Sequence, residues 1–415
     1  MKKHMKQALK ETFKYVAWFA GILVGVILLL TLVSAIPQSA IKNNVEKSAI
    51  YMQEIGDRPE IRDNEKWVLD IVTDVNMINI AYYLNSYDAF RAGLWGKYYN
   101  NPAPCFAYAL HEAITEGYAP NKIYPRYWHG YLVFLKPALM IFSYGGLRIM
   151  MHILFYALFA TILYLLYKRI NWKASLAFFV TMTASTFWLL PLNMQYVNVY
   201  FILFFSLTWL LWKQREVTPL PFMIIGMLTS FFDLLTAPGI TFVIFATVAV
   251  ALQKEQSIWK QLLNFLMWGT AWSVGYLAFW ACKWIIADHV FNNGTFQDAK
   301  GVIKYRTNMA HNQKPIIQVL KVNAGFIFYK WWTPIYAAVA IFMAAMWNRV
   351  KGIGVWPFAV LLTLVPPAWI IITKSHAQIH DIFTYRTLAA GFMPFLLPFF
   401  YEKTSEDVIS GVTDH

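Results

Sequence analysis

Long apolar runs alternate with short basic turns along most of this chain. The first run covers residues 15–36 and follows a lysine-rich start. Nine more runs cover residues 146–167, 174–191, 197–212, 220–236, 240–252, 262–286, 334–347, 355–373 and 388–400. A helix that crosses a bilayer needs about 20 predominantly apolar residues. The pattern therefore predicts an all-α integral membrane protein with about ten transmembrane helices.

Two long polar segments interrupt this pattern. Residues 37–129 carry Gly, Pro, Asn and many charges and contain no spanning run. The next run, 131–144, is short and includes Lys136 and Pro137, so we expect it to lie on the membrane surface. The second polar segment covers residues 287–332. The predicted organisation is a basic N-terminus with the first helix (1–36), a loop domain (37–144), helices two to seven (145–286), a second loop (287–332), and helices eight to ten with a tail (333–415).

The basic residues predict how the chain crosses the membrane. Four short turns, 168–173, 213–215, 254–260 and 349–351, each carry at least two Lys or Arg, whereas the opposite turns at 192–196 and 237–239 carry none. Short cytoplasmic turns of membrane proteins are enriched in Lys and Arg. We therefore expect both termini in the cytoplasm of a multi-pass plasma (inner) membrane protein. Both long segments and the connection 374–386 then lie on the extracytoplasmic face.

Composition narrows the class of protein. Hydrophobic residues make up 58% of the 415 residues and charged residues 14%, against about 25% charged in soluble domains. This excludes a soluble globular protein and a disordered one. The net charge of +13 fits the enrichment of Lys and Arg in cytoplasmic turns and contact with anionic membrane lipids. We therefore expect no nucleic-acid partner. Cys105 and Cys282 have no metal-binding spacing, and one bridge between them stays open.

Common catalytic motifs are missing from the sequence. The chain has no Gly-rich phosphate loop, no His-Glu-x-x-His and no Gly-x-Ser-x-Gly. ATP hydrolysis, zinc proteolysis and the common serine-hydrolase arrangement therefore have no support. Chemistry is expected where ionisable residues gather beside the membrane, and the predicted topology brings four such clusters to one face.

The first cluster is Thr-Asp-Val-Asn-Met-Ile-Asn at residues 73–79, which reads as the start of a helix. Asp74 is the candidate general base, because a positioned carboxylate can take the proton of an attacking hydroxyl. The alternative is that Asp74 only caps the helix. Asp70, one turn earlier, is interpreted as a solvated charge.

The second and third clusters contain Arg126, His129 and Asp233. Residues 124–131 read Tyr-Pro-Arg-Tyr-Trp-His-Gly-Tyr, which fits an interface anchor or a phosphate and sugar site. Asp233 lies near the outer end of an apolar helix, where a carboxylate is costly unless it has a partner. It is expected to orient a basic partner or the acceptor, or else to pair structurally with a nearby Arg.

The fourth cluster covers residues 374–386 and contains His376, His380, Tyr385 and Arg386. The two histidines lie four residues apart, but no obvious third ligand supports a metal pair, so a phosphate or pyrophosphate site is favoured. The second polar segment adds Lys304 and Arg306 to an excess of basic residues. Most of these are expected to be solvated, with Arg306 as the preferred exception.

With these residues in view, the chain resembles the GT-C superfamily of polytopic membrane glycosyltransferases, and in particular bacterial members that decorate cell-surface polysaccharide or teichoic acid. The resemblance lies in the layout and in the stretches 73–79, 124–130 and 376–386. It implies a polyprenyl-phosphate-linked sugar as donor, a glycan or lipid acceptor, and transfer with inversion outside the cytoplasm. The acid of the first loop corresponds to Asp74. Many members carry a second acidic residue beside it, and none lies within two positions here, so the need for a divalent cation stays open.

Two other classes remain as alternatives. One is a secondary transporter or flippase for a lipid-linked or anionic substrate, although the chain shows no internal repeat and its ionisable residues gather at one face. The other is a membrane acyltransferase with His376 or His380 as the base.

Overall fold

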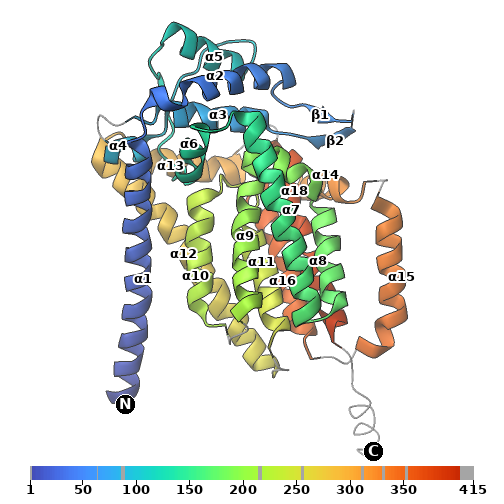
Figure 1. The fold of residues 1–415 in the computed structure, drawn as a ribbon. Helices are drawn as coiled ribbons and strands as arrows, with labels where there is room; N and C mark the ends of the chain where they lie inside the picture. Colours follow the sequence, from blue (N-terminus) through green and yellow to red (C-terminus); the bar gives the residue numbers. More distant parts are fainter. Residues whose placement is uncertain are drawn as a thin grey trace, which may run out of the picture.

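The computed structural model describes residues 2–62, 64–85, 89–213, 217–253, 257–309, 313–329, 332–350 and 354–401. These residues form a bundle of helices with a small cap at one end (Figure 1). Here the cap means residues 38–139. The N-terminal end of α1 lies at the opposite end of the bundle, as do the turn between α7 and α8 and the lower end of α12 (Figure 1).

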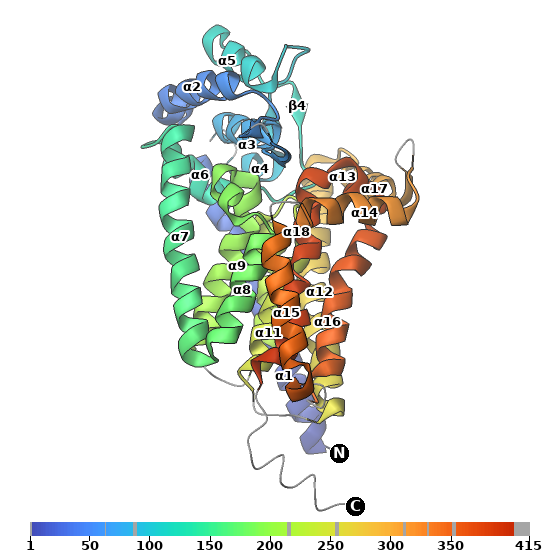
Figure 2. The same ribbon diagram turned by 90° about the vertical axis from the view of Figure 1, so that its right-hand side faces the viewer.

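The cap combines short helices with two small antiparallel sheets. Its elements are α2 (Gln38–Ile55), β1 (Glu60–Ile61), β2 (Asn64–Val68), α3 (Ile71–Tyr83), α4 (Ala89–Trp95), β3 (Lys97–Tyr98), α5 (Phe106–Glu116), β4 (Lys122–Ile123) and α6 (Leu132–Leu139). Strand β1 pairs with β2 and β3 pairs with β4. Helix α3 lies beneath α2 and α5, against the bundle, and most of its side chains are buried (Figures 1 and 2).

The bundle contains the long helices. Its elements are α1 (Lys2–Ser34), α7 (Tyr144–Arg169), α8 (Trp172–Ala184), η2 (Phe187–Leu192), α9 (Met194–Lys213), α10 (Pro219–Phe232), α11 (Gly239–Ala251), α12 (Ile258–Phe291), α15 (Thr333–Val350), α16 (Trp356–Ile372), α18 (Asp381–Ala389), α19 (Phe392–Leu396) and η5 (Leu397–Phe400). The short elements α13 (Thr295–Lys304), η3 (Tyr305–Met309), α14 (Ile316–Ile327) and α17 (Lys374–Ile379) lie at the cap end (Figure 2).

Five helical segments are long and apolar enough to cross a membrane. They are Leu9–Ser34, Tyr144–Arg169, Met194–Lys213, Ile258–Phe291 and Asp381–Phe400. The shorter apolar helices are Pro219–Phe232, Gly239–Ala251, Ile316–Ile327 and Trp356–Ile372. The all-α class is confirmed, and every run that the sequence analysis singled out is helical over most of its length. Ten spans are not shown, because several of these helices are short or broken.

Two predicted elements differ from the structure. The run 174–191 divides into α8 and η2 because Thr186 adopts a left-handed conformation with φ 52°. The segment 287–332, expected to be a loop, contains α13, the π-helical turn η3 and α14. Helix α14 is apolar but too short to register as a spanning run. The hydrophobic pattern alone could not find it for that reason.

Helices α10 and α12 cross in very close contact. A Cβ atom on Gly226 would lie 2.2 Å from the carbonyl oxygen of Trp272, and one on Gly275 would lie 2.1 Å from that of Met223. Small residues at such crossings let helix backbones approach in an apolar environment. The crossing fixes the end of α10, and with it the loop that enters the candidate site.

Candidate functional site

A cavity of about 100 Å³ lies where the cap meets the bundle. We call it the cap–bundle cavity. Its polar lining comes from segments far apart in the sequence: Asp70, Thr73 and Asn76 near the start of α3; Tyr124, Tyr127, His129 and Tyr131 from the loop before α6; Gln195 at the start of α9; Arg306 in η3; and His376 and His380 around α17. The first, second and fourth predicted clusters therefore meet here, and Leu234, which is next to Asp233 of the third cluster, also lines the cavity.

Asp70 is the acidic side chain that lines this cavity. It is the N-cap of α3, and its carboxylate accepts hydrogen bonds from the backbone N–H of Thr73 at 3.4 Å and from the Thr73 hydroxyl at 2.8 Å. The residue is only 5% exposed, so its interpretation as a solvated charge is wrong. Burial raises the pKa of Asp70 above its ordinary value, although the bonds from Thr73 oppose that shift.

Asp74 is not among the residues that line the cavity, and it is fully buried. Its carboxylate accepts hydrogen bonds from the Tyr144 hydroxyl at 2.6 Å and from the backbone N–H groups of Met194 at 2.8 Å and Gln195 at 3.0 Å. Burial raises the pKa of Asp74 to about 7 against these three donors. The carboxylate thus occupies the N-terminus of α9, where N–H groups lack helical partners. This geometry favours a structural role over the predicted role as base.

Hydrogen bonds from residues at the start of α9 also hold the backbone around Asp70 in place. The side chain of Asn193 donates to the carbonyl oxygen of Asp70 at 2.9 Å, and the Tyr196 hydroxyl donates to the carbonyl oxygen of Val68 at 3.1 Å. Together with the bonds of Asp74, these contacts join the start of α3 to the start of α9. The backbone is therefore held at Asp70 itself and two residues before it, at Val68.

Arg306 supplies a cationic side chain to the cavity. One guanidinium nitrogen, Nη1, lies 3.1 Å from Nδ1 of His376, and Nε2 of His376 lies 2.8 Å from the carbonyl oxygen of Leu235. Burial lowers the pKa of His376 well below its ordinary value, so the ring is neutral. Since a neutral ring has one N–H, His376 donates to Leu235 through Nε2 and accepts from Arg306 through Nδ1. It positions the guanidinium rather than binding an anion itself.

Among the described residues, no hydrogen bond joins Asp233 to Arg306 or His376, but Asp233 shapes the loop that holds His376. Both of its carboxylate oxygens lie 3.0 Å from the backbone N–H of Thr236, which closes the loop after α10. Leu235 in that loop has φ 67°, an uncommon value for a non-glycine residue. The loop presents the Leu235 carbonyl to His376. Within the described ranges no ion pair joins Asp233 to an Arg, and Leu234 rather than Asp233 lines the cavity.

His129 and His380 line the cavity as neutral rings. The Nε2 atom of His129 lies 2.6 Å from the carbonyl oxygen of Tyr124, and Nδ1 lies 2.9 Å from the Tyr131 hydroxyl. Burial lowers the pKa of His129 to about 3. Burial and the nearby Arg306 lower the pKa of His380 to about 3 as well. His129 has φ 57°, so its loop, like that of Leu235, is strained beside the cavity.

Gly96 packs directly against the ring of His129, which gives a first prediction. A Cβ atom on Gly96 would lie 2.7 Å from Nε2 of His129, and its φ is +61°. We expect Gly96→Ala to lower stability by well over the 1–2 kcal/mol that a left-handed conformation alone costs. Thermal unfolding in detergent measures this. Gly117→Ala is the matched control because Gly117 has φ +72° and nothing within 4 Å; equal losses in both variants would contradict the packing argument.

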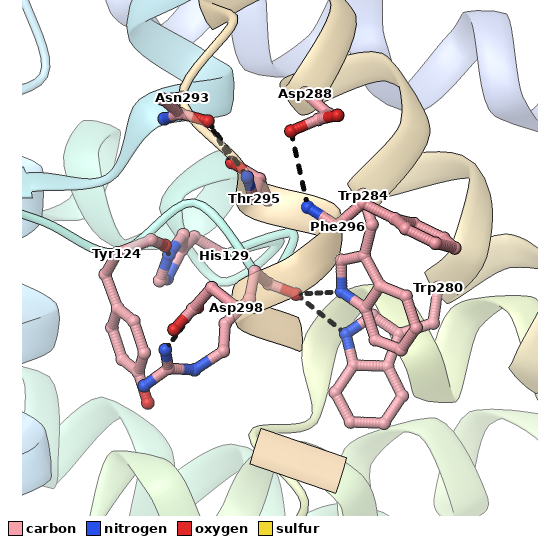
Figure 3. A network of polar contacts seen from close by, with 10 residues as sticks. Tyr124, His129, Trp280, Trp284, Asp288, Asn293, Thr295, Phe296 and Asp298 are labelled. Carbon is pink, nitrogen blue, oxygen red and sulfur yellow. Dashed lines mark hydrogen bonds and ion pairs between the residues drawn. The ribbon is translucent and has the colours of Figure 1, made fainter. Parts of the chain in front are cut away.

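Arg126 forms a separate network, whose partners Tyr124, Asp298, Trp280 and Trp284 are labelled in Figure 3. Its guanidinium pairs with Asp298 at 2.7 Å and lies over the ring of Tyr124. Its carbonyl oxygen accepts the indole N–H groups of both Trp280 and Trp284 at 2.8 Å, as Figure 3 shows. These contacts anchor the loop that carries His129 to α12 and α13. Arg126 itself does not line the cavity.

Three other predicted site residues also lie outside the cavity lining. Lys304 is exposed at the end of α13. Tyr385 is buried, stacks on Phe326 and hydrogen-bonds the Thr186 hydroxyl. Arg386 is fully buried, lies over the rings of Tyr196 and Tyr385, and donates to the carbonyl oxygens of Ser185 and Ile382 at 3.2 Å. The structure thus gives Tyr385 and Arg386 packing roles in the bundle.

Several buried polar atoms of the cavity lining have no hydrogen-bond partner. They are Oδ1 of Asn76, Oε1 of Gln195 and Nε of Arg306. Buried polar atoms in proteins are nearly always paired, so unpaired ones in a cavity point to a ligand that completes them. Gln195 was not among the site residues predicted from the sequence. The signal was available, because Asn193 and Gln195 are polar residues at the junction of two apolar runs.

Metal binding has little support in the described structure. No group of three or more His, Cys, Asp or Glu side chains in the part of the chain that the structure describes is placed to hold a metal ion. Cys105 and Cys282 are both free.

Comparisons with family models, with curated proteins and with solved structures find no match to this chain.

Proposed function

We propose that the protein is a membrane glycosyltransferase that moves a sugar from a polyprenyl-phosphate donor to a hydroxyl of a glycan or lipid acceptor. One observation carries the proposal: the Asp70 carboxylate and the Arg306 guanidinium line the same cavity, among polar atoms without partners. No ion pair joins these two side chains, both of which lie in the described part of the chain. An acid and a cation are thus available to a substrate at one place.

Asp70 serves as the general base in this proposal, in place of Asp74. The acceptor hydroxyl attacks the anomeric carbon from the face opposite the donor phosphate. As the new carbon–oxygen bond forms, the hydroxyl proton passes to the Asp70 carboxylate. The bond from the anomeric carbon to the phosphate oxygen breaks, and its electron pair leaves with the lipid phosphate. The sugar is transferred with inversion.

Arg306 stabilises the charge that develops on the leaving phosphate. Its guanidinium is held by neutral His376, so its position is set before the substrate binds. Fixed donors aimed at developing charge are among the largest contributors to catalysis. The π-helical turn that carries Arg306 agrees with this role, because such turns occur frequently at functional sites. The rings of Tyr124, Tyr127 and Phe383 offer apolar faces to a sugar.

The membrane arrangement is part of the proposal. The end of the bundle remote from the cap carries the described basic residues of the short turns, which are Lys168, Arg169, Lys173, Lys213, Lys260 and Arg349. An excess of Lys and Arg favours a cytoplasmic location for that end. The cap and the cavity then face the extracytoplasmic side of the plasma membrane. The bundle helices, including the short ones, would be embedded as about ten segments. A lipid-linked donor would reach the cavity from the outer leaflet.

The alternatives receive less support from the site. An acyltransferase would need His376 or His380 as base, and both ring nitrogens of His376 are already engaged. A transporter or flippase would move its substrate without making a covalent product.

The direct test is transfer by purified protein in liposomes. The donors are a panel of short-chain polyprenyl-phosphate sugars, and mass spectrometry of the acceptor detects an added hexose or related sugar. Flux of the lipid without an adduct would instead support the transporter. An acyl mass on the acceptor would support the acyltransferase.

The pH dependence of transfer follows from Asp70. A base works in its deprotonated form, so kcat/KM falls as the pH drops through the pKa of Asp70. Burial raises that pKa, so we expect the acid limb to be centred above 3.8. His129 and His380, with pKa values of about 3, stay neutral over this range and do not contribute. A profile measured from about pH 4 to about pH 8 that stays flat in the wild type would contradict the assignment.

A further inference from the structure

A second cavity, of about 160 Å³, lies next to the first and is not used by the proposed mechanism. We call it the α4 cavity. Ile80 lines both cavities, and Gly96, which packs on His129, lines this one. Its polar lining includes Asn85, Arg91, Trp95 and Lys97, and none of its described lining residues is acidic. Both formal charges in the lining are therefore positive.

The donors in this cavity are held in place by packing. The Trp95 ring stacks on Phe291 with 4.2 Å between ring centroids, and the ammonium of Lys97 lies 4.2 Å from the centre of the same ring. The indole N–H of Trp95 is buried and has no partner. An indole nitrogen can only donate, so its missing partner is an acceptor. An oxyanion would satisfy this N–H and the ammonium together.

Two buried lysines contact the backbone just before α4 and near its end. Lys136 in α6 donates to the carbonyl oxygen of Leu84, and Lys283 in α12 donates to that of Leu94. Both side chains are fully buried. A buried cation normally pairs with a carboxylate, because leaving water is costly. Here the described partners are backbone carbonyls, and burial lowers the pKa of Lys136 to about 8. The positive charge that an anion in the α4 cavity would meet therefore comes from Arg91 and Lys97 of its lining.

The position of α4 indicates where such an anion would come from. Ser34, the last residue of α1, donates to the carbonyl oxygen of Ala89 at 3.0 Å. A Cβ atom on Gly93 would lie 2.9 Å from Cβ of Leu30, so α4 packs tightly against the end of α1. Phe291, which stacks on Trp95, is the last residue of α12. Both helices are long and apolar enough to span a membrane. Their ends place the cavity at the level of lipid headgroups.

We propose that the α4 cavity binds a phosphate group, supplied by the headgroup of an anionic membrane lipid. The phosphate oxygens accept hydrogen bonds from the indole N–H of Trp95 and the ammonium of Lys97. The lipid chains extend into the membrane beside the ends of α1 and α12. The proposal rests on the membrane arrangement of the proposed function but does not require sugar transfer.

The test is calorimetric titration of the purified full-length protein in a neutral detergent. The probes are dihexanoyl-phosphatidylglycerol, inorganic phosphate and dihexanoylglycerol, which lacks a phosphate. We expect saturable binding of the phospholipid, at least tenfold tighter than that of inorganic phosphate, and none of dihexanoylglycerol. Trp95→Phe keeps the stacked ring but removes the N–H, and Lys97→Gln removes the charge. Each variant is expected to weaken phospholipid binding about tenfold, which is the scale of one hydrogen bond to a charged group.

Lys300→Gln is the matched control, because Lys300 is exposed and lies over the ring of Phe296 as Lys97 lies over Trp95. It should bind like the wild type. No saturable binding, or affinities unchanged in Trp95→Phe and Lys97→Gln, would overturn the site. Equal affinity for phospholipid and inorganic phosphate would overturn the lipid as its source. Asp70→Asn should bind phospholipid normally, so a failure of the proposed enzymatic function is distinguishable from a failure of this site.

Discussion

Asp70→Asn is expected to slow sugar transfer by about 100- to 10,000-fold, which is the range supplied by a positioned general base. The change removes the charge but keeps the shape. Asn is as good an N-cap as Asp, so α3 should keep its start and the protein its fold. The loss is expected in kcat with little change in the melting temperature. Initial rates of transfer to the acceptor and thermal unfolding in detergent provide the two measurements.

Asp74→Asn is the informative comparison, because it separates the two carboxylates of α3. It leaves an amide against three donors that now bond to a carboxylate, so we expect a loss of about 2–4 kcal/mol in stability. Protein that remains folded should retain transfer. Glu65→Gln is the control, because it changes an exposed carboxylate of the same cap. It should lower neither the stability nor the rate of transfer. If Asp74→Asn folded normally but lost transfer while Asp70→Asn remained active, the base would be Asp74.

The sequence alone does not determine which of these two aspartates lines the cavity. Residues 70 and 74 lie one turn apart at the start of the same helix, and each can cap it or face a substrate. Which of them faces the cavity depends on how α3 is rotated. That rotation is fixed by the N–H groups of Met194 and Gln195 and by the side chain of Asn193, about 120 residues later. No local pattern contains that information.

The apolar helices were predictable because their hydrophobic runs are local. The meeting of His129, Arg306 and His376 was also anticipated as a convergence on one face, because each belongs to a segment between apolar runs. The contacts that each of these side chains makes were not predictable in the same way. Lys304 and Arg306 are two residues apart, yet one is exposed and the other enters the cavity, since a π-helical turn begins between them. Arg386 read as a phosphate ligand but is buried against two tyrosine rings.

The hydrogen bonds around Arg306 indicate that its position, as well as its charge, decides how strongly it stabilises the leaving phosphate in the proposed reaction. Asp233 shapes the loop whose carbonyl holds His376, and His376 holds one nitrogen of the guanidinium. Asp233 and His376 are both buried and held by backbone contacts. A lysine at the same place would supply charge without the planar fork that His376 and a phosphate can share.

Arg306→Gln is therefore expected to lower kcat for transfer by about 100- to 1,000-fold, which is the cost of removing one preorganised donor from developing charge. Arg306→Lys should recover only part of the rate, because it restores the charge but not the geometry set by His376. Lys304→Gln is the matched control, since Lys304 is an exposed cation two residues away and outside the cavity. It should transfer at the wild-type rate. If Arg306→Gln retained kcat within about threefold, the leaving phosphate would have to be stabilised elsewhere, and the α4 cavity with Lys97 would be the next candidate.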